Sequence, residues 1–127
     1  MSDIREWTVL VVEDEPDSMA VVTEILEHYN IKVYQCPSAE EAIQLMESFT
    51  PTMAILDLAL PEMDGWALLN HIRATPTTTN IPVVAVTAFH SANVAQKAIA
   101  AGFNAYFPKP IDTTSFVREL ERIVSAA

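Results

Sequence analysis

Acidic, hydroxyl and basic side chains follow or end four short apolar stretches of this 127-residue chain. Glu13 and Asp14 follow WTVLVV, Asp57 follows MAIL, Thr87 ends IPVVAVT and Lys109 ends NAYFPK. A carboxylate at the end of a buried apolar run is costly unless it has a partner or a task. The recurrence of such residues at four stretch ends therefore indicates a site, with Asp57 at its centre.

The residue types define the chemistry that this site could support. Two carboxylates about 4 Å apart repel each other by roughly 4 kcal/mol at an effective dielectric constant of about 20. Three clustered acids therefore call for a hard cation, and Mg²⁺ suits a site with few oxygen ligands because it retains several waters. Lys109 adds a mobile positive charge and Thr87 adds a hydroxyl, both suited to phosphoryl oxygens. Together these groups predict phosphoryl transfer to a carboxylate.

The hydrophobic pattern explains how residues so far apart in the sequence could meet. Five strand-like runs alternate with five segments of helical periodicity, which predicts an α/β fold with a parallel sheet and helices on both faces. Short connections and right-handed crossovers favour a doubly wound, flavodoxin-like sheet. In the strand order 2-1-3-4-5, the polar residues lie around Asp57 at the carboxyl edge. The expected strands are Trp7–Val12, Ile31–Cys36, Met53–Asp57, Ile81–Thr87 and Asn104–Lys109.

Start and stop signals place five helices between and after these strands. Pro16 stands at a first helical position, Ser38 and Glu41 form a capping box, and Gly102 ends an Ala-rich helix. Asp112 is expected to cap the last helix. Apolar residues at helical spacing predict the inner faces: Met19, Val22, Ile25, Leu26 and Tyr29; Ala39, Ala42, Ile43, Met46 and Phe49; Leu68, Leu69 and Ile72; Phe116, Leu120, Ile123 and Val124.

Composition narrows the class of function. The net charge is −10, and the stretch EDEPD concentrates four acids, so direct binding to nucleic acid is not expected. The single Cys36 excludes an internal disulfide and fits a reducing compartment. The sequence has no apolar run long enough to cross a membrane and no secretory signal pattern at its start. It therefore predicts one cytoplasmic domain over residues 1–127, with no membrane partner.

Four motifs resemble those of the response-regulator receiver domains of two-component signalling. They are VVEDEP, AILDLALPEMDG, VVAVTA and YFPKP, in the family's order and spacing across roughly Thr8–Val124. The resemblance implies that Asp57 accepts a phosphoryl group from a histidine kinase or phosphotransfer protein, and that the chain then acts on a downstream protein target. It also implies that Asp14, with Glu13 assisting through water, and the backbone carbonyl of Ala59 hold Mg²⁺ beside Asp57.

The same resemblance implies roles for three further residues. Thr87 and Lys109 bind the phosphoryl group, and Tyr106 is an aromatic switch whose rotamer follows Thr87. The Lys109–Pro110 bond is expected to be cis, in keeping with the preference of cis bonds for proline. Such a domain catalyses only its own phosphorylation and slow dephosphorylation. The segment GFNAYF lacks the acidic pair common in DNA-binding regulators, and it resembles stand-alone and hybrid-kinase receivers.

Three other functions share part of this pattern. An FMN-binding flavodoxin-like module needs small and hydroxyl residues after the first strand, where EDEPD would repel phosphate unless a metal intervened. A haloacid-dehalogenase-like phosphotransferase needs a second Asp two residues after Asp57, where Ala59 stands. A pseudo-receiver would bind partners without phosphorylation, although the full set of site residues argues against it. His28, His71 and His90 have no metal-ligand partners at useful spacing, although His90 could line the phosphodonor entrance.

Overall fold

Short runs of Val, Ile and Leu form the centre of a parallel sheet whose strands are in the order β2-β1-β3-β4-β5. The structure is a computed structural model that describes residues 3–88 and 91–126. Within these ranges, every helix is too short or too polar to span a membrane. The strands are β1 (Thr8–Val12), β2 (Lys32–Cys36), β3 (Met53–Leu56), β4 (Val83–Thr87) and β5 (Ala105–Pro108). The fold class and strand order predicted from the sequence are confirmed.

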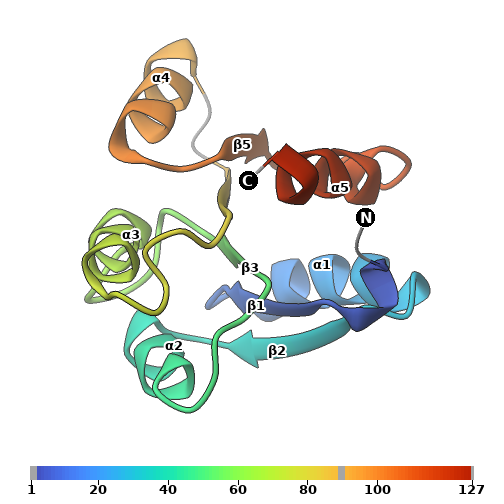
Figure 1. Ribbon diagram of the computed structural model, residues 1–127. Helices are drawn as coiled ribbons and strands as arrows, with labels where there is room; N and C mark the ends of the chain where they lie inside the picture. The colour runs from blue at the N-terminus through green and yellow to red at the C-terminus, as the bar shows by residue number, and fades with distance from the viewer. Residues whose placement is uncertain (1–2, 89–90, 127) are drawn as a thin grey trace.

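Helices cover both faces of the sheet (Figure 1). Helices α1 and α5 lie on one face, and α2, α3 and α4 lie on the other. A short 3-10 helix, η1, precedes β1. The bounds are η1 (Ile4–Glu6), α1 (Pro16–His28), α2 (Ala39–Met46), α3 (Gly65–Ala74), α4 (Ala92–Ala101) and α5 (Phe116–Ala126).

The central strands are apolar on both faces because helices cover both faces. In β1, Val9 and Val11 belong to the core under α1 and α5, whereas Leu10 and Val12 belong to the core under α2, α3 and α4. This alternation follows from the two-residue period of a strand. The edge strands β2 and β5 are more exposed. Burial is therefore deepest in the central strands β1, β3 and β4.

The helix starts follow most of the predicted signals. Pro16 is the first residue of α1, and Gly102 ends α4 with a φ of 117°, a conformation that glycine adopts readily. The Ser38 hydroxyl accepts a hydrogen bond from the Glu41 N–H at 3.2 Å. The Glu41 carboxylate accepts from the Ser38 hydroxyl instead of the Ser38 backbone, so only half of the capping box forms.

Three expectations about helix ends are wrong. Helix α5 begins at Phe116, four residues after Asp112, because the Asp112 carboxylate binds the Thr114 N–H and hydroxyl and forms a turn before the helix. Tyr29 lies beyond the end of α1 and is 38% exposed. Phe49 lies beyond the end of α2 and contacts the Tyr34 ring, with centroids 4.7 Å apart. For Tyr29 and Phe49, the apolar spacing extends past the point where the backbone leaves the helix.

Arg73, the penultimate residue of α3, connects three segments at the amino edge of the sheet. Its guanidinium donates to Thr79 O at 3.1 Å and Ile81 O at 2.7 Å, both in the connection to β4. It also donates to Gly102 O and to Asn104 Oδ1, each at 2.9 Å, just before β5. A planar group with several fixed donors suits these four acceptors. Arg73 thus holds the ends of α3 and α4 to the sheet.

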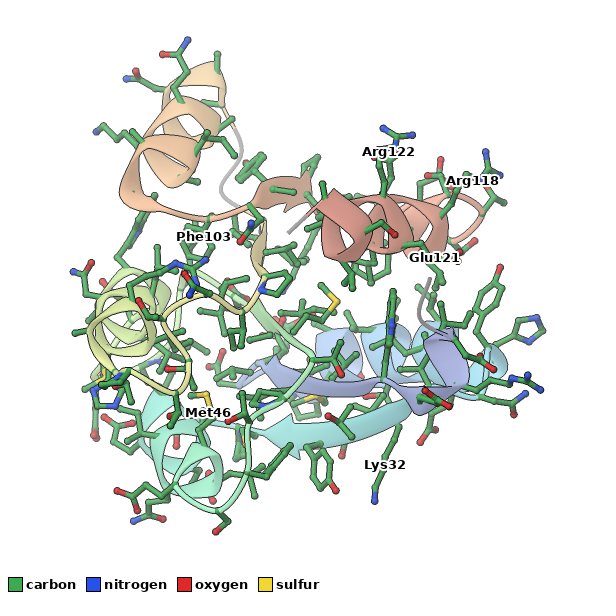
Figure 2. All side chains as sticks on the ribbon, in the orientation of Figure 1. Lys32, Met46, Phe103, Arg118, Glu121 and Arg122 are labelled. Carbon is green, nitrogen blue, oxygen red and sulfur yellow. The ribbon has the colours of Figure 1, made fainter. Side chains whose placement is uncertain are left out.

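The substitution Arg73→Lys should lower the free energy of unfolding by about 1–3 kcal/mol, because one ammonium cannot reach all four acceptors. Urea unfolding followed by circular dichroism measures this difference. Arg118→Lys is the matched control, since Figure 2 shows Arg118 pointing outward from α5, and its cost should stay within about 0.5 kcal/mol. Equal unfolding midpoints for Arg73→Lys and wild type would contradict this role.

Candidate phosphorylation site

The candidate site lies at the carboxyl edge of the sheet, where backbone ladder bonds continue past the strands. The Glu13 N–H donates to Cys36 O, the Asp57 N–H donates to Val12 O, and the Lys109 N–H donates to Thr87 O, each at 3.0 Å. The charged side chains therefore start from a fixed backbone. They face a cleft of about 440 Å³ lined by Glu13, Asp14, Glu15, Pro16, Asp57, Ala59, Thr87, Ala88 and Lys109.

Lys109 joins two buried carboxylates in this cleft. Its Nζ lies 2.5 Å from Glu13 Oε1 and 2.9 Å from Asp57 Oδ2. Glu13 is 5% exposed and Asp57 is 7% exposed, so both acids are largely removed from water. Among the residues that line the cleft, Lys109 is the one cation. Its ammonium therefore compensates two neighbouring acids that would otherwise repel each other.

The surroundings move the pKa values of these two acids in opposite directions. Burial raises the pKa of Glu13 above its ordinary range, even though Lys109 donates a hydrogen bond to it. Burial acts in the same direction on Asp57, but hydrogen bonds from Lys109 and from the Ala59 N–H, 2.9 Å away, outweigh it and hold the Asp57 pKa below its ordinary value. These shifts favour the ionised form more strongly at Asp57 than at Glu13, and the ionised form is the one that a carboxylate nucleophile needs.

The acidic residues have a donor set that fits a divalent cation. Carboxylate oxygens of Glu13, Asp14 and Asp57 all lie within 4.8 Å of one another. Oxygen donors at this spacing suit Mg²⁺, which keeps part of its water shell. Asp14 is exposed to solvent, unlike the other two acids, so a hydrated ion can reach its carboxylate directly. The predicted ligand Ala59 also lines the cleft, and the role of its carbonyl stays a prediction.

The two predicted switch residues lie on neighbouring strands. Thr87 is fully buried at the end of β4 and lines the cleft. Tyr106 pairs with Ala85 in the sheet and packs against the core under α4, and Thr87 lies two residues after Ala85 on the same face. Burial raises the pKa of Tyr106, opposed by a hydrogen bond with the Ser91 backbone at the start of α4. Thr87 in the cleft, Tyr106 on β5 and Ser91 at the start of α4 thus form a continuous path from the cleft to α4.

The remaining sequence predictions near the site have mixed outcomes. The Lys109–Pro110 peptide bond is cis, as expected. His28 and His71 are exposed, as expected for surface residues. His90, suggested for the phosphodonor entrance, lies outside the described residues. The expectation that Asp57 ends the third strand is off by one residue, since β3 ends at Leu56.

Ser18 is a site residue that the sequence analysis missed. Its hydroxyl accepts a hydrogen bond from Lys109 Nζ at 3.1 Å and donates to Glu15 Oε1 at 3.0 Å. The available signal was Pro16, which fixes the start of α1 and so places Ser18 in the first helical turn, beside the acidic strand end. A serine in a first turn is common enough that this signal alone identifies no role.

Gly65 supports the site from behind Asp57. A Cβ at residue 65 would lie 2.4 Å from Asp57 O and 2.8 Å from the Cα of Leu58. The Gly65 N–H donates to Leu58 O at 3.1 Å, and Asp64 caps α3 by accepting from the Ala67 N–H at 2.9 Å. The loop after β3 therefore turns back against its own start, which requires a residue without a side chain.

We expect Gly65→Ala to lower the free energy of unfolding by about 1–3 kcal/mol, because the backbone at Asp57 must move away from the new methyl group. An unstrained helix would respond oppositely, gaining up to about 1 kcal/mol from alanine. Urea unfolding gives the sign, and the amide NMR shifts of Asp57 and Ala59 report the displacement.

Gly102→Ala is the control, because a Cβ there comes no closer than 3.7 Å to another residue, although its φ of 117° strains alanine. It should cost stability while leaving the Asp57 and Ala59 amide shifts unchanged. A stabilised Gly65→Ala protein with unmoved Asp57 shifts would contradict the packing described for this loop.

Comparisons with known proteins agree with the fold. The response regulator receiver domain family matches residues 9–121. The chain therefore belongs to the response regulator receiver domain family, whose members are phosphorylation-activated signalling domains.

Three similar proteins illustrate the range of this family. An uncharacterized 14.6 kDa protein of Leptolyngbya boryana is 34% identical over 122 residues, which cover 96% of this chain and 93% of that protein. The histidine kinase BarA of Escherichia coli K12 is 30% identical over 105 residues, which cover 83% of this chain but only 11% of the kinase.

A solved structure supplies the third similarity. The receiver domain of the sensor histidine kinase PA1611 from Pseudomonas aeruginosa is 26% identical, with a TM-score of 0.85. The match covers 94% of this chain and 98% of that domain, whose crystal structure contains a magnesium ion coordinated in the active-site cleft.

Proposed function

We propose that this chain is a signalling switch in which Asp57 accepts a phosphoryl group from a histidine kinase or phosphotransfer protein. The observation that carries the proposal is the position of Asp57, directly after β3 in a cleft shared with three other acids, Thr87 and Lys109. Hydrogen bonds from Lys109 and the Ala59 N–H lower the Asp57 pKa there. Similarity to the receiver domains of sensor histidine kinases supports a kinase as the donor.

In this proposal, each residue of the cleft has a separate task. An Asp57 oxygen attacks the phosphorus of a phosphohistidine, the O–P bond forms, and the P–N bond to the donor imidazole breaks. Lys109 stabilises the charge on the transferred oxygens, and the Thr87 hydroxyl donates a hydrogen bond to one of them. Mg²⁺ held by Asp14, Glu13, Asp57 and the Ala59 carbonyl would supply further neutralisation of phosphoryl charge.

The output step runs along the path from Thr87 through Tyr106 to α4. Inward movement of the Thr87 hydroxyl toward the phosphoryl group opens room into which the Tyr106 ring turns, which changes the surface formed by α4, β5 and α5. A downstream protein that prefers this surface shifts the balance of states by its differential affinity. The chain catalyses only its own phosphorylation and slow dephosphorylation, so it is a switch and not an enzyme acting on a separate substrate.

Two further parts of the proposal concern context. Residues 1–127 form one receiver domain, and the chain works in the cytoplasm without contacting nucleic acid or membrane. A pseudo-receiver that binds partners without phosphorylation is less well supported, because the acids, Thr87 and Lys109 all meet in one cleft.

The phospho-acceptor assignment predicts that acetyl phosphate with Mg²⁺ adds one phosphoryl group to the wild-type chain, located on Asp57 by peptide mapping. Asp57→Asn should abolish incorporation and retain the fold. Asp64→Asn is the matched control, because asparagine caps a helix as well as aspartate does and residue 64 lies outside the cleft lining. Phosphate that persists on the Asp57→Asn protein would show that another residue is the acceptor.

The metal assignment predicts that Mg²⁺ at ten times its Kd adds about 1.4 kcal/mol to the free energy of unfolding, seen as a rise in Tm. Asp14→Asn should remove this effect, since it takes away one of the three clustered carboxylates. Asp17→Asn, on α1 and outside that cluster, should retain it. Identical melting of wild type in EDTA and in excess Mg²⁺ would contradict a metal site in the cleft.

A further inference from the structure

Lys109 has three N–H donors, and the structure assigns an acceptor to each. Two acceptors are the carboxylates of Glu13 and Asp57, at 2.5 and 2.9 Å. The third is the hydroxyl of Ser18 on α1, at 3.1 Å. Ser18 is therefore the one uncharged member of this shell. The ammonium is held from the α1 side as well as from the strand ends.

The Ser18 hydroxyl is oriented for this contact by a closed ring of hydrogen bonds. Its proton goes to Glu15 Oε1 at 3.0 Å, which leaves its lone pairs for Lys109. The Glu15 N–H in turn donates to Glu13 Oε2 at 3.2 Å, and Glu13 Oε1 accepts a hydrogen bond from Lys109, which closes the ring. Ser18 is consequently an acceptor toward Lys109 because Glu15 fixes its rotamer and its proton.

The ammonium and a divalent cation would bind the same two carboxylates. Glu13 and Asp57 belong to the clustered acids that fit Mg²⁺, and both are bound by Lys109. A metal ion bound to these carboxylates lies beside the ammonium, so the two positive charges repel each other and each favours the absence of the other. Any group that holds Lys109 in place therefore weakens metal binding, and Ser18 does so without adding charge to the site.

We propose that Ser18 is a positioning residue that holds Lys109 over Glu13 and Asp57 and thereby lowers the affinity of the site for Mg²⁺. This inference rests on the metal site of the proposed function. It makes α1 a determinant of metal occupancy, since only the contact from α1 can be removed without changing the charge of the cluster. Ser18 acts through Lys109 and has no role of its own in the phosphoryl transfer.

The test is a titration of each protein with MgCl₂ alone, followed by the NMR shift of the Ala59 amide, with no phosphodonor present. Ser18→Ala should lower the Kd for Mg²⁺ about fivefold, the effect of one net hydrogen bond. Ser18→Thr retains the hydroxyl and should bind as wild type does. A Ser18→Ala Kd within twofold of wild type, or a wild type that does not bind Mg²⁺, overturns the proposal.

A double-mutant cycle separates this role from a general effect on α1. In a Lys109→Met background, Ser18→Ala should leave the Kd unchanged, because the residue through which it acts is gone. The same fivefold effect in that background overturns the proposal. Phosphorylation of Asp57 by acetyl phosphate is measured separately in wild type, so its failure would reject the phospho-acceptor while leaving the comparison of metal affinities intact.

Discussion

The contact of one ammonium with two buried carboxylates is the interaction on which the rest of this structure depends. Glu13 is the first residue after β1 and Asp57 is the first residue after β3, and these two strands are neighbours in the sheet. Side by side in a low-dielectric cleft, the two acids would oppose the pairing of these strands. Lys109 reaches them from the end of β5, across the position of β4. The charge balance of the site thus links both halves of the sheet.

This arrangement stabilises the chain in a state that its proposed function must disturb. The Lys109 ammonium that compensates the acids in the resting structure would contact the phosphoryl group instead, and a metal ion would bind the same carboxylates. Such sites store unfavourable electrostatics that the surrounding core offsets. Here that core is the apolar centre of β1, β3 and β4, whose strands are buried on both faces. The buried sheet fixes the backbone positions from which the acids extend into the cleft.

Much of this architecture could be predicted from the sequence, because its signals are local. Alternating apolar runs and helical periodicity specify a doubly wound sheet, and parallel strands bring their carboxyl ends to one edge. The cluster around Asp57 follows from that rule together with the strand order 2-1-3-4-5. The details that escaped prediction depend on side-chain geometry between distant segments. The bond from Lys109 to Ser18 and the close approach of Gly65 to Asp57 O have no local signature. Likewise, the sequence around Asp112 is compatible with a helix cap or with a turn, and in the structure its carboxylate accepts from the Thr114 N–H and forms a turn.

The most direct test of the central interaction is the stability of Lys109→Met, measured by urea unfolding in EDTA near pH 8. Loss of the ammonium leaves two buried acids without compensation, so the free energy of unfolding should fall by about 3 kcal/mol. Addition of Asp57→Asn to this variant should recover much of the loss, because a single buried carboxylate then remains. If Lys109→Met is as stable as wild type, the ammonium is not what allows Glu13 and Asp57 to lie together.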